Sequence, residues 1–408
     1  MRLSIVSINY APERTGIGVY TAGMAEFLAA RGHQVVVHSG FTYYPDWEKP
    51  PADRGQLYRR EQIKGVDLRR SYLYVPRRPT ALKRIIHEFS FVATASIAYL
   101  FAPRADRTVI ILPPLALGSA IALIAKLKGS PTILHVQDLQ PDAAVELGML
   151  KPGLLTRILY ALERLNYRLV DKVSTISEGM RRKILGKGVP LEKTILFRNW
   201  ANDDTVRPGD RMTPLRAEWG LAQGDFVVLY SGNLGRKQGL DSLLEAASLL
   251  RDRPDVKIVI VGNGAEQPEL VEKARTMSLA NVMFHPLQPI ERLSELLATA
   301  DVSVIPQKRA VTDIVLPSKL CNILASGRPV VAAAPPTSDL AMILRDGNCG
   351  ILVEPEDGRQ MAEAIRTLAA DQARASMLAA NGRRYAETNL LQSAVIGRFE
   401  TDALADGR

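Results

Sequence analysis

Short apolar segments alternate with amphipathic segments along the whole chain. The apolar runs predict strands at residues 2–8, 33–39, 106–112, 130–136 and 171–177, and again at 226–232, 256–262, 281–286, 300–306, 328–334 and 349–355. In the first segment between strands, Ile17, Tyr20, Met24 and Phe27 recur at helical spacing, and Gly32 ends the pattern. Strand and helix in alternation predict crossover units around parallel sheets, an α/β fold.

The length of the chain favours two domains over one. At 408 residues it exceeds the size of an ordinary single core. A polar, turn-rich stretch at 199–220 separates the two series of strands and is expected to be a linker. We therefore expect an N-terminal domain over 1–200, a C-terminal domain over 201–385, and a final helix over 386–408 that returns to the first domain. Two Rossmann-like domains facing across a cleft would place the binding site where strand ends meet.

Composition and charge indicate which kinds of ligand and which cellular compartment to expect. The chain carries 52 Lys and Arg against 43 Asp and Glu, a formal charge of +9 that suits a phosphate-bearing ligand, nucleic acid or an anionic membrane, or serves solubility alone. Cys321 and Cys349 are the only cysteines, so a disulfide framework is excluded and a cytoplasmic protein is expected. The N-terminus has no signal-peptide pattern, and the apolar run at 89–102 is too short to span a bilayer.

A glycine-rich bend follows the first strand of the second half. In "SGNLGRKQG" (231–239), backbone N–H groups and the Lys237 ammonium suit the oxygens of a phosphate group. The pattern is not a Walker A loop, and "GNGAEQ" (262–267) is not a dinucleotide fingerprint. A plain tight turn would also explain the glycines.

A second segment with similar chemistry opens a predicted helix. Pro317, Ser318 and Lys319 form its first turn, where proline leaves the next two N–H groups free to face an anion. A lysine there opposes the helix dipole, which indicates a bound anion, although a solvated surface lysine remains the alternative. Asn322 lies one turn further on.

Four motifs in this order resemble family 4 of the retaining glycosyltransferases, across nearly the whole chain. They are 9–37 (with "NYAPERTGIGVY"), 231–241 ("SGNLGRKQGLD"), 261–264 ("VGNG") and 317–331 ("PSKLCNILASGRPVV"). The resemblance implies the GT-B fold of two Rossmann-like domains. Within the family the chain looks most like bacterial enzymes of exopolysaccharide and O-antigen synthesis that transfer fucose-type sugars.

The resemblance also implies roles for individual residues. Lys237 and Lys319 match the lysines that contact the donor diphosphate during catalysis. The implied donor-binding residues are Gly16, Gly18, Asn199, Gly232, Asn233, Arg236, Asn263, Gly264, Ser318 and Asn322. The implied donor is a GDP- or UDP-linked sugar, used as a substrate, and no metal or other cofactor is expected.

The chain departs from the family at two places. The paired glutamates of the family's E-x7-E motif appear here as Ile314 and Asn322, so ribose and sugar recognition are expected to differ. The family's usual arginine ahead of the first lysine is replaced by Asn233, and Arg236 is a candidate to compensate.

The acceptor side is expected near the end of the strand at 130–136. Asp138 is the best candidate for a catalytic or sugar-binding acid, and Gln137 stands where many relatives have a histidine. His135 is a weaker candidate, because a lone histidine in an apolar strand is more often a satisfied core residue. Asp138 could instead be the N-cap of the next helix. Asp203 and Asp204 suggest a turn or cap rather than a metal site.

Residues 69–101 mix cations and aromatic residues ahead of an apolar helix. Such a segment suits the interface of an anionic membrane, where a polyprenyl-linked saccharide acceptor would be reached, or it is an ordinary helix with a solvated basic flank. Peripheral contact with the inner face of the plasma membrane is therefore expected, and nucleic acid is not. A sugar-nucleotide epimerase and a non-catalytic nucleotide-sugar binder remain the alternatives to a transferase.

Overall fold

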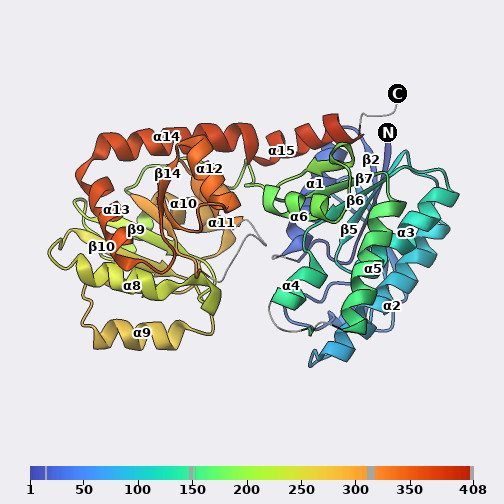
Figure 1. The fold of residues 1–408 in the computed structure, drawn as a ribbon, viewed down its shortest axis with the longest axis horizontal. Coiled ribbons are helices and arrows are strands. Elements are labelled where there is room, and N and C mark those ends of the chain that lie inside the picture. The colour runs from blue at the N-terminus through green and yellow to red at the C-terminus, as the bar shows by residue number, and fades with distance from the viewer. Residues whose placement is uncertain (14–15, 147–149, 152, 310–317, 405–408) are drawn as a thin grey trace. The chain divides into compact units, whose positions relative to one another are not determined.

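The computed structural model describes residues 1–13, 16–146, 150–151, 153–309 and 318–404. The chain forms two compact units. The first comprises Met1–Arg198 and the C-terminal residues from Ile396 onward, and the second comprises Asn199–Val395. Each unit is an α/β domain built on its own sheet (Figure 1), which confirms the predicted fold class.

The sheet of the first unit has the strand order β3-β4-β2-β1-β5-β6-β7-β8. All neighbours are parallel except β3 and β4, which are antiparallel. The strands are β1 Arg2–Ser7, β2 Gln34–Gly40, β3 Tyr58–Ile63, β4 Val66–Ser71, β5 Arg107–Leu112, β6 Thr132–Val136, β7 Lys172–Thr175 and β8 Thr194–Leu196.

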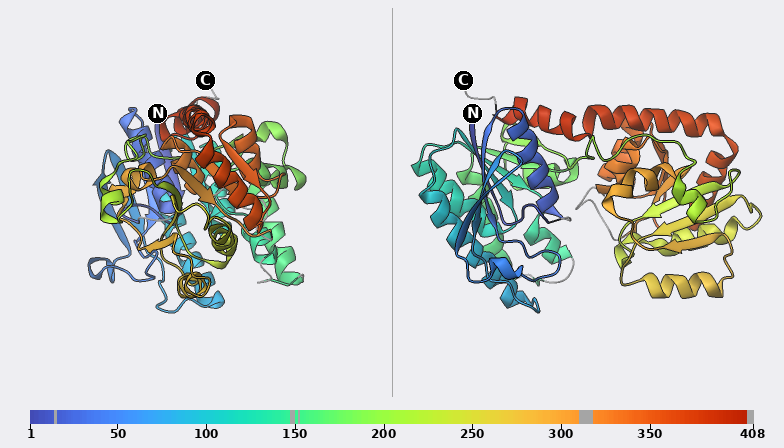
Figure 2. Two further views of the ribbon diagram at one scale, coloured as in Figure 1. Left: turned by 90° about the vertical axis from the view of Figure 1, so that its left-hand side faces the viewer. Right: turned by 180° about the vertical axis from the view of Figure 1, so that it is seen from behind.

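Helices cover both faces of this sheet (Figures 1 and 2). Helix α1 lies on one face, and α2, α3 and α5 lie side by side on the other, where α3 packs between its neighbours. The helices are α1 Ile17–Ala30, α2 Ala81–Leu100, α3 Leu115–Leu127, α4 Gln140–Glu146, α5 Leu154–Leu169 and α6 Glu178–Gly186, with short 3-10 turns η1 Pro51–Asp53 and η2 Leu191–Lys193.

The sheet of the second unit is wholly parallel, with the order β11-β10-β9-β12-β13-β14. Its strands are β9 Phe226–Ser231, β10 Val256–Val261, β11 Val282–His285, β12 Val302–Ile305, β13 Val330–Ala333 and β14 Gly350–Val353. Its helices and turns are α7 Pro214–Glu218, η3 Arg236–Gln238, α8 Leu240–Leu249, α9 Gln267–Thr276, η4 Ile290–Arg292, α10 Leu293–Ala298, α11 Ser318–Ala325, α12 Asp339–Gly347, α13 Gly358–Ala370 and α14 Gln372–Asn389.

Alternate residues of the central strand β9 serve two separate cores. Val228 and Tyr230 pack toward α8 and α13, whereas Val227 and Leu229 pack toward α7 and α10. A strand buried on both faces reads as a continuous apolar run, which is why its position could be predicted from sequence.

The chain ends in α15 Gln392–Phe399 and the π-helical turn η5 Glu400–Leu404. Phe399 stacks on Phe197 with ring centroids 4.1 Å apart. Glu400 accepts hydrogen bonds from Arg31 and from the ring of His33, at 2.6 and 2.8 Å. The last turns of the chain are therefore anchored in the first unit.

The hairpin of β3 and β4 was not predicted from the sequence. Its strands are rich in charged residues and lack the apolar runs on which the prediction rested. The sequence feature that could have indicated this hairpin is Gly65 in its two-residue turn. In the structure, Lys64 and Gly65 both have positive φ (45° and 80°). Such a turn matches the twist of a tight hairpin and favours glycine at its second position.

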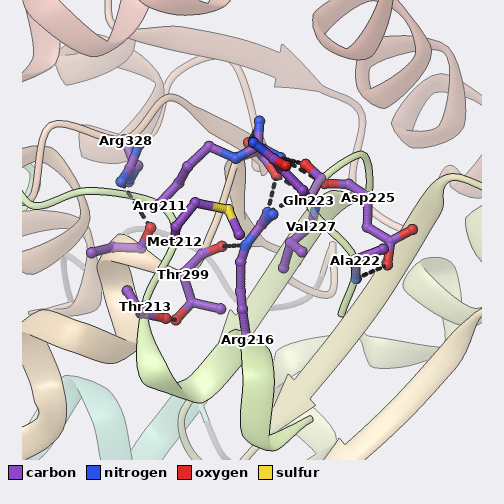
Figure 3. Close-up of polar contacts among 12 residues, drawn as sticks. Arg211, Met212, Thr213, Arg216, Ala222, Gln223, Asp225, Val227, Thr299 and Arg328 are labelled. Atoms are coloured by element: carbon purple, nitrogen blue, oxygen red, sulfur yellow. Dashed lines mark hydrogen bonds and ion pairs between the residues drawn. The ribbon is translucent and has the colours of Figure 1, made fainter. Parts of the chain in front are cut away.

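The segment at 199–220, expected to be a polar linker, is tied firmly into the second unit (Figure 3). Arg216 on α7 is only 1% exposed, and its guanidinium donates to the Asp301 carboxylate and to the Thr299 carbonyl oxygen. Arg211 reaches the other oxygen of Asp301 at 3.1 Å. Asp301 also accepts the backbone N–H of Val227, so the same carboxylate joins this segment to β9.

Candidate active site

The loop that follows β9 forms a tight cradle in the second unit. Gly232 opens it with φ 141°, and Gly239 closes it in the left-handed region with φ 62°. A Cβ at Gly239 would lie 3.0 Å from the carbonyl carbon of Gln307, so only glycine fits there. The side chains of Arg236 and Lys237 on η3 are exposed, as is that of Asn233.

The loop after β10 lies directly against this cradle. The Leu234 N–H donates to the Asn263 carbonyl oxygen at 2.9 Å. A Cβ at Gly262 would lie 1.8 Å from the Gly232 oxygen, and a Cβ at Gly264 would lie 2.2 Å from the Leu234 oxygen. The two backbones can approach this closely only because both positions are glycine, and the contact leaves the Asn263 side chain exposed.

Lys319 reaches the same cradle from the first turn of α11. Its Nζ donates to the Tyr230 hydroxyl at 3.1 Å and to Gln238 Oε1 at 3.4 Å, and lies 4.2 Å from the centroid of the Tyr230 ring. An added Cβ at Gly232 would be 3.1 Å from this ammonium. Burial lowers the pKa of Lys319 to about 8, and no acidic side chain of the described part of the chain pairs with it. Ser318, beside it, is exposed.

The polar surroundings of α11 include Asn199. Its carbonyl oxygen accepts a hydrogen bond from the Cys321 thiol at 3.5 Å. Its side-chain Oδ1 is buried and has no hydrogen-bond partner among the described residues. Asn322, on the same helix, is half-buried. Pro317 and Ile314, the other positions considered from sequence, lie outside the described residues.

In the first unit, glycines shape the start of α1. Gly16 precedes the helix with φ 67°. A Cβ at Gly18 would lie 2.9 Å from Glu13 Oε2. Glu13, which sequence analysis did not select, is 7% exposed; its Oε1 accepts the backbone N–H groups of Tyr43 and Tyr44 at 3.4 and 3.3 Å. Burial raises the pKa of this carboxyl, and its Oε2 has no partner among the described residues.

The two acceptor-side candidates near the end of β6, His135 and Asp138, have different surroundings. His135 is 1% exposed, with Nδ1 2.9 Å from Ser174 Oγ and Nε2 2.9 Å from Gln137 Nε2. Burial lowers the pKa of His135 to about 3, so the ring is neutral, and both nitrogens are already occupied within the fold. Asp138 is half-buried and follows β6 at the carboxyl edge of the sheet, the edge at which ligands bind in parallel α/β domains.

A pocket of about 250 Å³ opens at this same edge of the first sheet. Loops after β1, β2 and β5 contribute to its walls. Tyr43, Trp47 and His87 give it an aromatic lining, with the His87 ring 4.5 Å from Tyr43 and 5.2 Å from Trp47. Arg84 and Glu88 supply polar groups from the first half of α2. The sequence signal was the aromatic cluster after the strand at 33–39, which the motif comparison did not use.

Acidic side chains near the start of the second unit have structural partners. Asp203 accepts the N–H and hydroxyl of Ser393, at 3.0 and 2.6 Å, at the start of α15. Asp204 pairs with Arg207. Across the residues that the structure describes, no group of three His, Cys, Asp or Glu side chains is arranged to hold a metal ion.

The structure thus gathers the predicted residues in two places. In the second unit, the β9 loop, the β10 loop and the start of α11 bring Lys319 together with Gly232, Asn233 and Gly264. In the first unit, Gly16 and Asp138 lie on loops at the carboxyl edge of the sheet, and Gly18 lies in the first turn of α1. The partners Tyr230 and Gln238 of Lys319 were not selected from sequence.

Two family models match the chain, one in each half. The model described as glycosyl transferase 4-like domain covers residues 15–200, and that described as glycosyl transferases group 1 covers residues 212–385. The chain therefore belongs to the glycosyltransferases and has their GT-B fold, as the sequence motifs predict.

Individual relatives agree with this assignment. The chain is 38% identical to the putative colanic acid biosynthesis glycosyl transferase WcaI of Escherichia coli K12, over 98% of this chain and 99% of that protein. In fold it is similar to the sucrose-phosphate synthase of Thermosynechococcus elongatus, with a TM-score of 0.73 and 19% identity over the full length of both chains. Anabaena HepE, solved in complex with UDP-glucose, gives a TM-score of 0.70 at 16% identity, over 99% of this chain and all of that one.

Proposed function

We propose that this glycosyltransferase moves a sugar from a nucleotide diphosphate donor to a lipid-linked saccharide, with retention of anomeric configuration, in exopolysaccharide synthesis. The observation that carries the proposal is the partly buried Lys319 ammonium, which has no acidic partner among the described residues and lies over a cradle of glycine backbone. A buried cation without a counterion is costly unless an anion binds beside it. The name of the Escherichia coli relative supports the polysaccharide pathway, and the HepE complexes support a nucleotide-sugar donor.

The diphosphate is assigned to the second unit. Lys319 contributes charge from α11, and Lys237 contributes a second, solvent-facing ammonium from η3. The close contact of the β9 and β10 loops fixes the backbone N–H groups that line the cradle, so that little reorganisation accompanies binding. Asn263, exposed on the β10 loop, is placed to contact the nucleoside.

The chemical step follows from these charges. The bond between the anomeric carbon and the diphosphate oxygen breaks, and negative charge grows on the leaving diphosphate, where both lysines stabilise it. The acceptor hydroxyl attacks from the same face and passes its proton to the leaving phosphate oxygen, so no protein nucleophile is required. The cationic side chains take the place of a metal ion. Asp138 is assigned to the acceptor side.

For the sugar, we propose a 6-deoxy hexose, with GDP-fucose favoured over a UDP-linked N-acetylfucosamine. The proposal rests on the similarity of the "SGNLGRKQGL" and "PSK" motifs to those of fucose-type transferases. Asn322 in place of the family's ribose-binding glutamate removes a negative charge beside the nucleotide, but this change does not select the base.

The acceptor sugar is assigned to the aromatic pocket of the first unit. Aromatic rings such as Trp47 pack against the apolar face of a sugar, while Arg84 and Glu88 can bind its hydroxyls. The Nε2 of His87, which has no hydrogen-bond partner within the described part of the chain, provides a further polar contact. The pocket lies at the carboxyl edge of the sheet, beside Gly16 at the start of α1.

Membrane contact is proposed for the outer surface of α2. Leu82, Ile85, Ile86 and Phe89 are between 47% and 68% exposed, an unusual run of apolar side chains in water. Arg84 lies among them, as a membrane-surface helix requires. Among the described residues, no helix is long and apolar enough to cross a bilayer. The first half of α2 also lines the acceptor pocket, so a lipid-linked saccharide held at this surface would reach it.

Donor identity is tested by displacement and turnover. Bound donor analogue is competed with GDP and with UDP, and transfer to extracted lipid-linked saccharides is then followed by mass spectrometry with GDP-fucose and GDP-mannose. We expect tighter binding of GDP and faster transfer from GDP-fucose. Tighter binding of UDP would move the donor to N-acetylfucosamine, and a preference for a 6-hydroxylated hexose would refute the 6-deoxy proposal. An isomerised sugar nucleotide without acceptor would indicate an epimerase.

A further inference from the structure

A larger pocket, of about 530 Å³, lies at the opposite end of the first sheet from the acceptor pocket. It is lined by Arg2 and Gln34, the first residues of β1 and β2, and by Asp67 near the start of β4. This edge of the sheet is the one at which the N-terminus lies in Figure 1. Parallel α/β domains bind their substrates at the carboxyl ends of strands, so this pocket is not part of the transferase site.

Strand register explains why polar side chains gather here. His38 pairs with Arg69 across β2 and β4, and Arg69 pairs with Arg60 across β4 and β3, so the three side chains point to one face of the sheet. Ser4 on β1 pairs with Val36, two residues before His38, and therefore shares this face. Polar groups from four adjacent strands thus line one hollow.

The floor of the pocket carries buried groups that the fold leaves without partners. His38 is 0% exposed, and neither of its ring nitrogens has a hydrogen-bond partner among the described residues. Ser4 is 4% exposed, and its hydroxyl is also without one. Burial lowers the pKa of His38 to about 3, so the ring is neutral and offers one donor and one acceptor. Polar groups left unsatisfied in a buried position destabilise the fold.

The walls of the pocket are cationic. Asp67 accepts two hydrogen bonds from Arg60, at 2.7 and 3.1 Å, and two from Arg69, at 3.3 and 3.0 Å. One carboxylate therefore orients two guanidinium groups and neutralises only one, and each keeps N–H groups for another acceptor. With Arg2, three arginines against one aspartate leave a formal charge of +2.

The helix end that borders the pocket does not cancel this charge. The carbonyl oxygens at the end of α2 would repel an anion. Lys128 donates to the carbonyl oxygens of Tyr99, at 2.7 Å, and of Leu100 and Ala102, and so neutralises that end. Glu400, which pairs with the rim residue His33, is itself held by Arg31. The lining of the pocket therefore stays net positive.

We propose that this pocket is a second ligand site, which binds a small phosphorylated molecule through its phosphate group. A phosphate monoester carries between one and two negative charges and three acceptor oxygens, which match the charge and the separated donors of Arg2, Arg60 and Arg69. The volume exceeds that of a bare phosphate, so the pocket has room for the organic part of the ligand above the layer that contains His38 and Ser4. The proposal is independent of the donor assigned to the second unit.

The test uses the histidines as reporters. The chain has five, so selective labelling of the ring Cε1 gives five NMR signals. His38 reports the pocket, whereas His285, whose carbonyl oxygen accepts the Gly262 N–H, reports the donor loops. The probes are orthophosphate and glucose 6-phosphate, with glucose and citrate as comparisons. We expect both phosphates to shift the His38 signal with saturation, glucose 6-phosphate more tightly, while glucose leaves it unchanged.

Matched variants decide whether the arginines are responsible. Arg2 and Arg60 are exposed, so the double variant Arg2→Gln, Arg60→Gln should fold normally while the lining loses its excess positive charge. We expect its affinity for glucose 6-phosphate to fall by at least roughly tenfold. The control Arg275→Gln removes an exposed, carboxylate-paired arginine of the second unit and should leave affinity unchanged. A His38 signal that no phosphate moves, equal affinity in the double variant, or a response to citrate alone would overturn the proposal.

Discussion

Replacing Lys319 by methionine should stabilise the second unit while weakening the proposed anion site. In the folded protein the pKa of Lys319 is about 8 rather than 10.5, which corresponds to roughly 3 kcal/mol of penalty on the charged form. Methionine loses the hydrogen bond to Tyr230 and the contact with its ring, worth about 1–2 kcal/mol. We therefore expect the free energy of unfolding at about pH 7 to rise by about 1–2 kcal/mol.

The dependence on pH identifies the cause of this gain. The folded-state pKa lies below the unfolded one, so between about pH 8 and pH 10.5 the unfolded chain binds more protons, and wild-type stability rises with pH. The penalty on Lys319 is complete below about pH 8 and disappears above about pH 10.5, so the advantage of the methionine variant should shrink over this window.

Urea unfolding followed by tryptophan fluorescence measures the effect, because Trp200 and Trp219 both belong to the second unit. Lys237→Met is the matched control, since Lys237 is exposed, and its stability should be unchanged. Both variants should bind nucleoside diphosphate more weakly. A destabilised Lys319→Met variant, or a gain that is equal near pH 7 and pH 10, would refute the reasoning from burial.

Three further outcomes are expected. Replacing Lys237 or Lys319 by alanine should cost roughly 2–4 kcal/mol of transition-state stabilisation in each case, measured as a lower kcat/KM of the folded protein. Turnover near the wild-type level in both variants would contradict the diphosphate assignment. Chelators should leave turnover unchanged; loss of turnover that magnesium or manganese restores would show a metal requirement. Phe89→Ser should weaken flotation of the protein with anionic vesicles, and added salt should weaken it as well. The control variant Leu249→Ser, which changes an exposed leucine of the second unit, should leave flotation unchanged.

The predictable part of the fold is the part that is buried on both faces. Strands such as β9 and β10 read as apolar runs because helices cover each side of the sheet. The charged hairpin of β3 and β4 is held by its turn and by cross-strand pairs such as Ile63 with Val66, so hydrophobic periodicity carries no signal for it. Residues 199–220 were predicted to be a linker for a related reason. From the sequence alone Arg216 is expected at the surface, because its ion-pair partner Asp301 lies 85 residues further along the chain.

In the candidate site, too, some residues could be predicted from the sequence and others could not. Glycines and lysines at loop positions could be selected because their chemistry is local, and the structure places Lys319 against the β9 loop. Glu13 could not be selected by this reasoning, since what distinguishes it is burial against the backbone of Tyr43 and Tyr44, thirty residues away. The setting of Lys319, with Tyr230 and Gln238, also depends on contacts between distant segments.

The glycine contacts between the β9 and β10 loops limit how the proposed donor site can be redesigned. Side chains are forbidden at Gly262 and Gly264 by backbone oxygens of the facing loop, so these positions tolerate no diversity in a combinatorial library. Asn233, Arg236 and Asn263 project from the same two loops into solvent. A library that keeps the glycines and randomises these three positions can therefore explore new nucleotides without dismantling the scaffold that presents them.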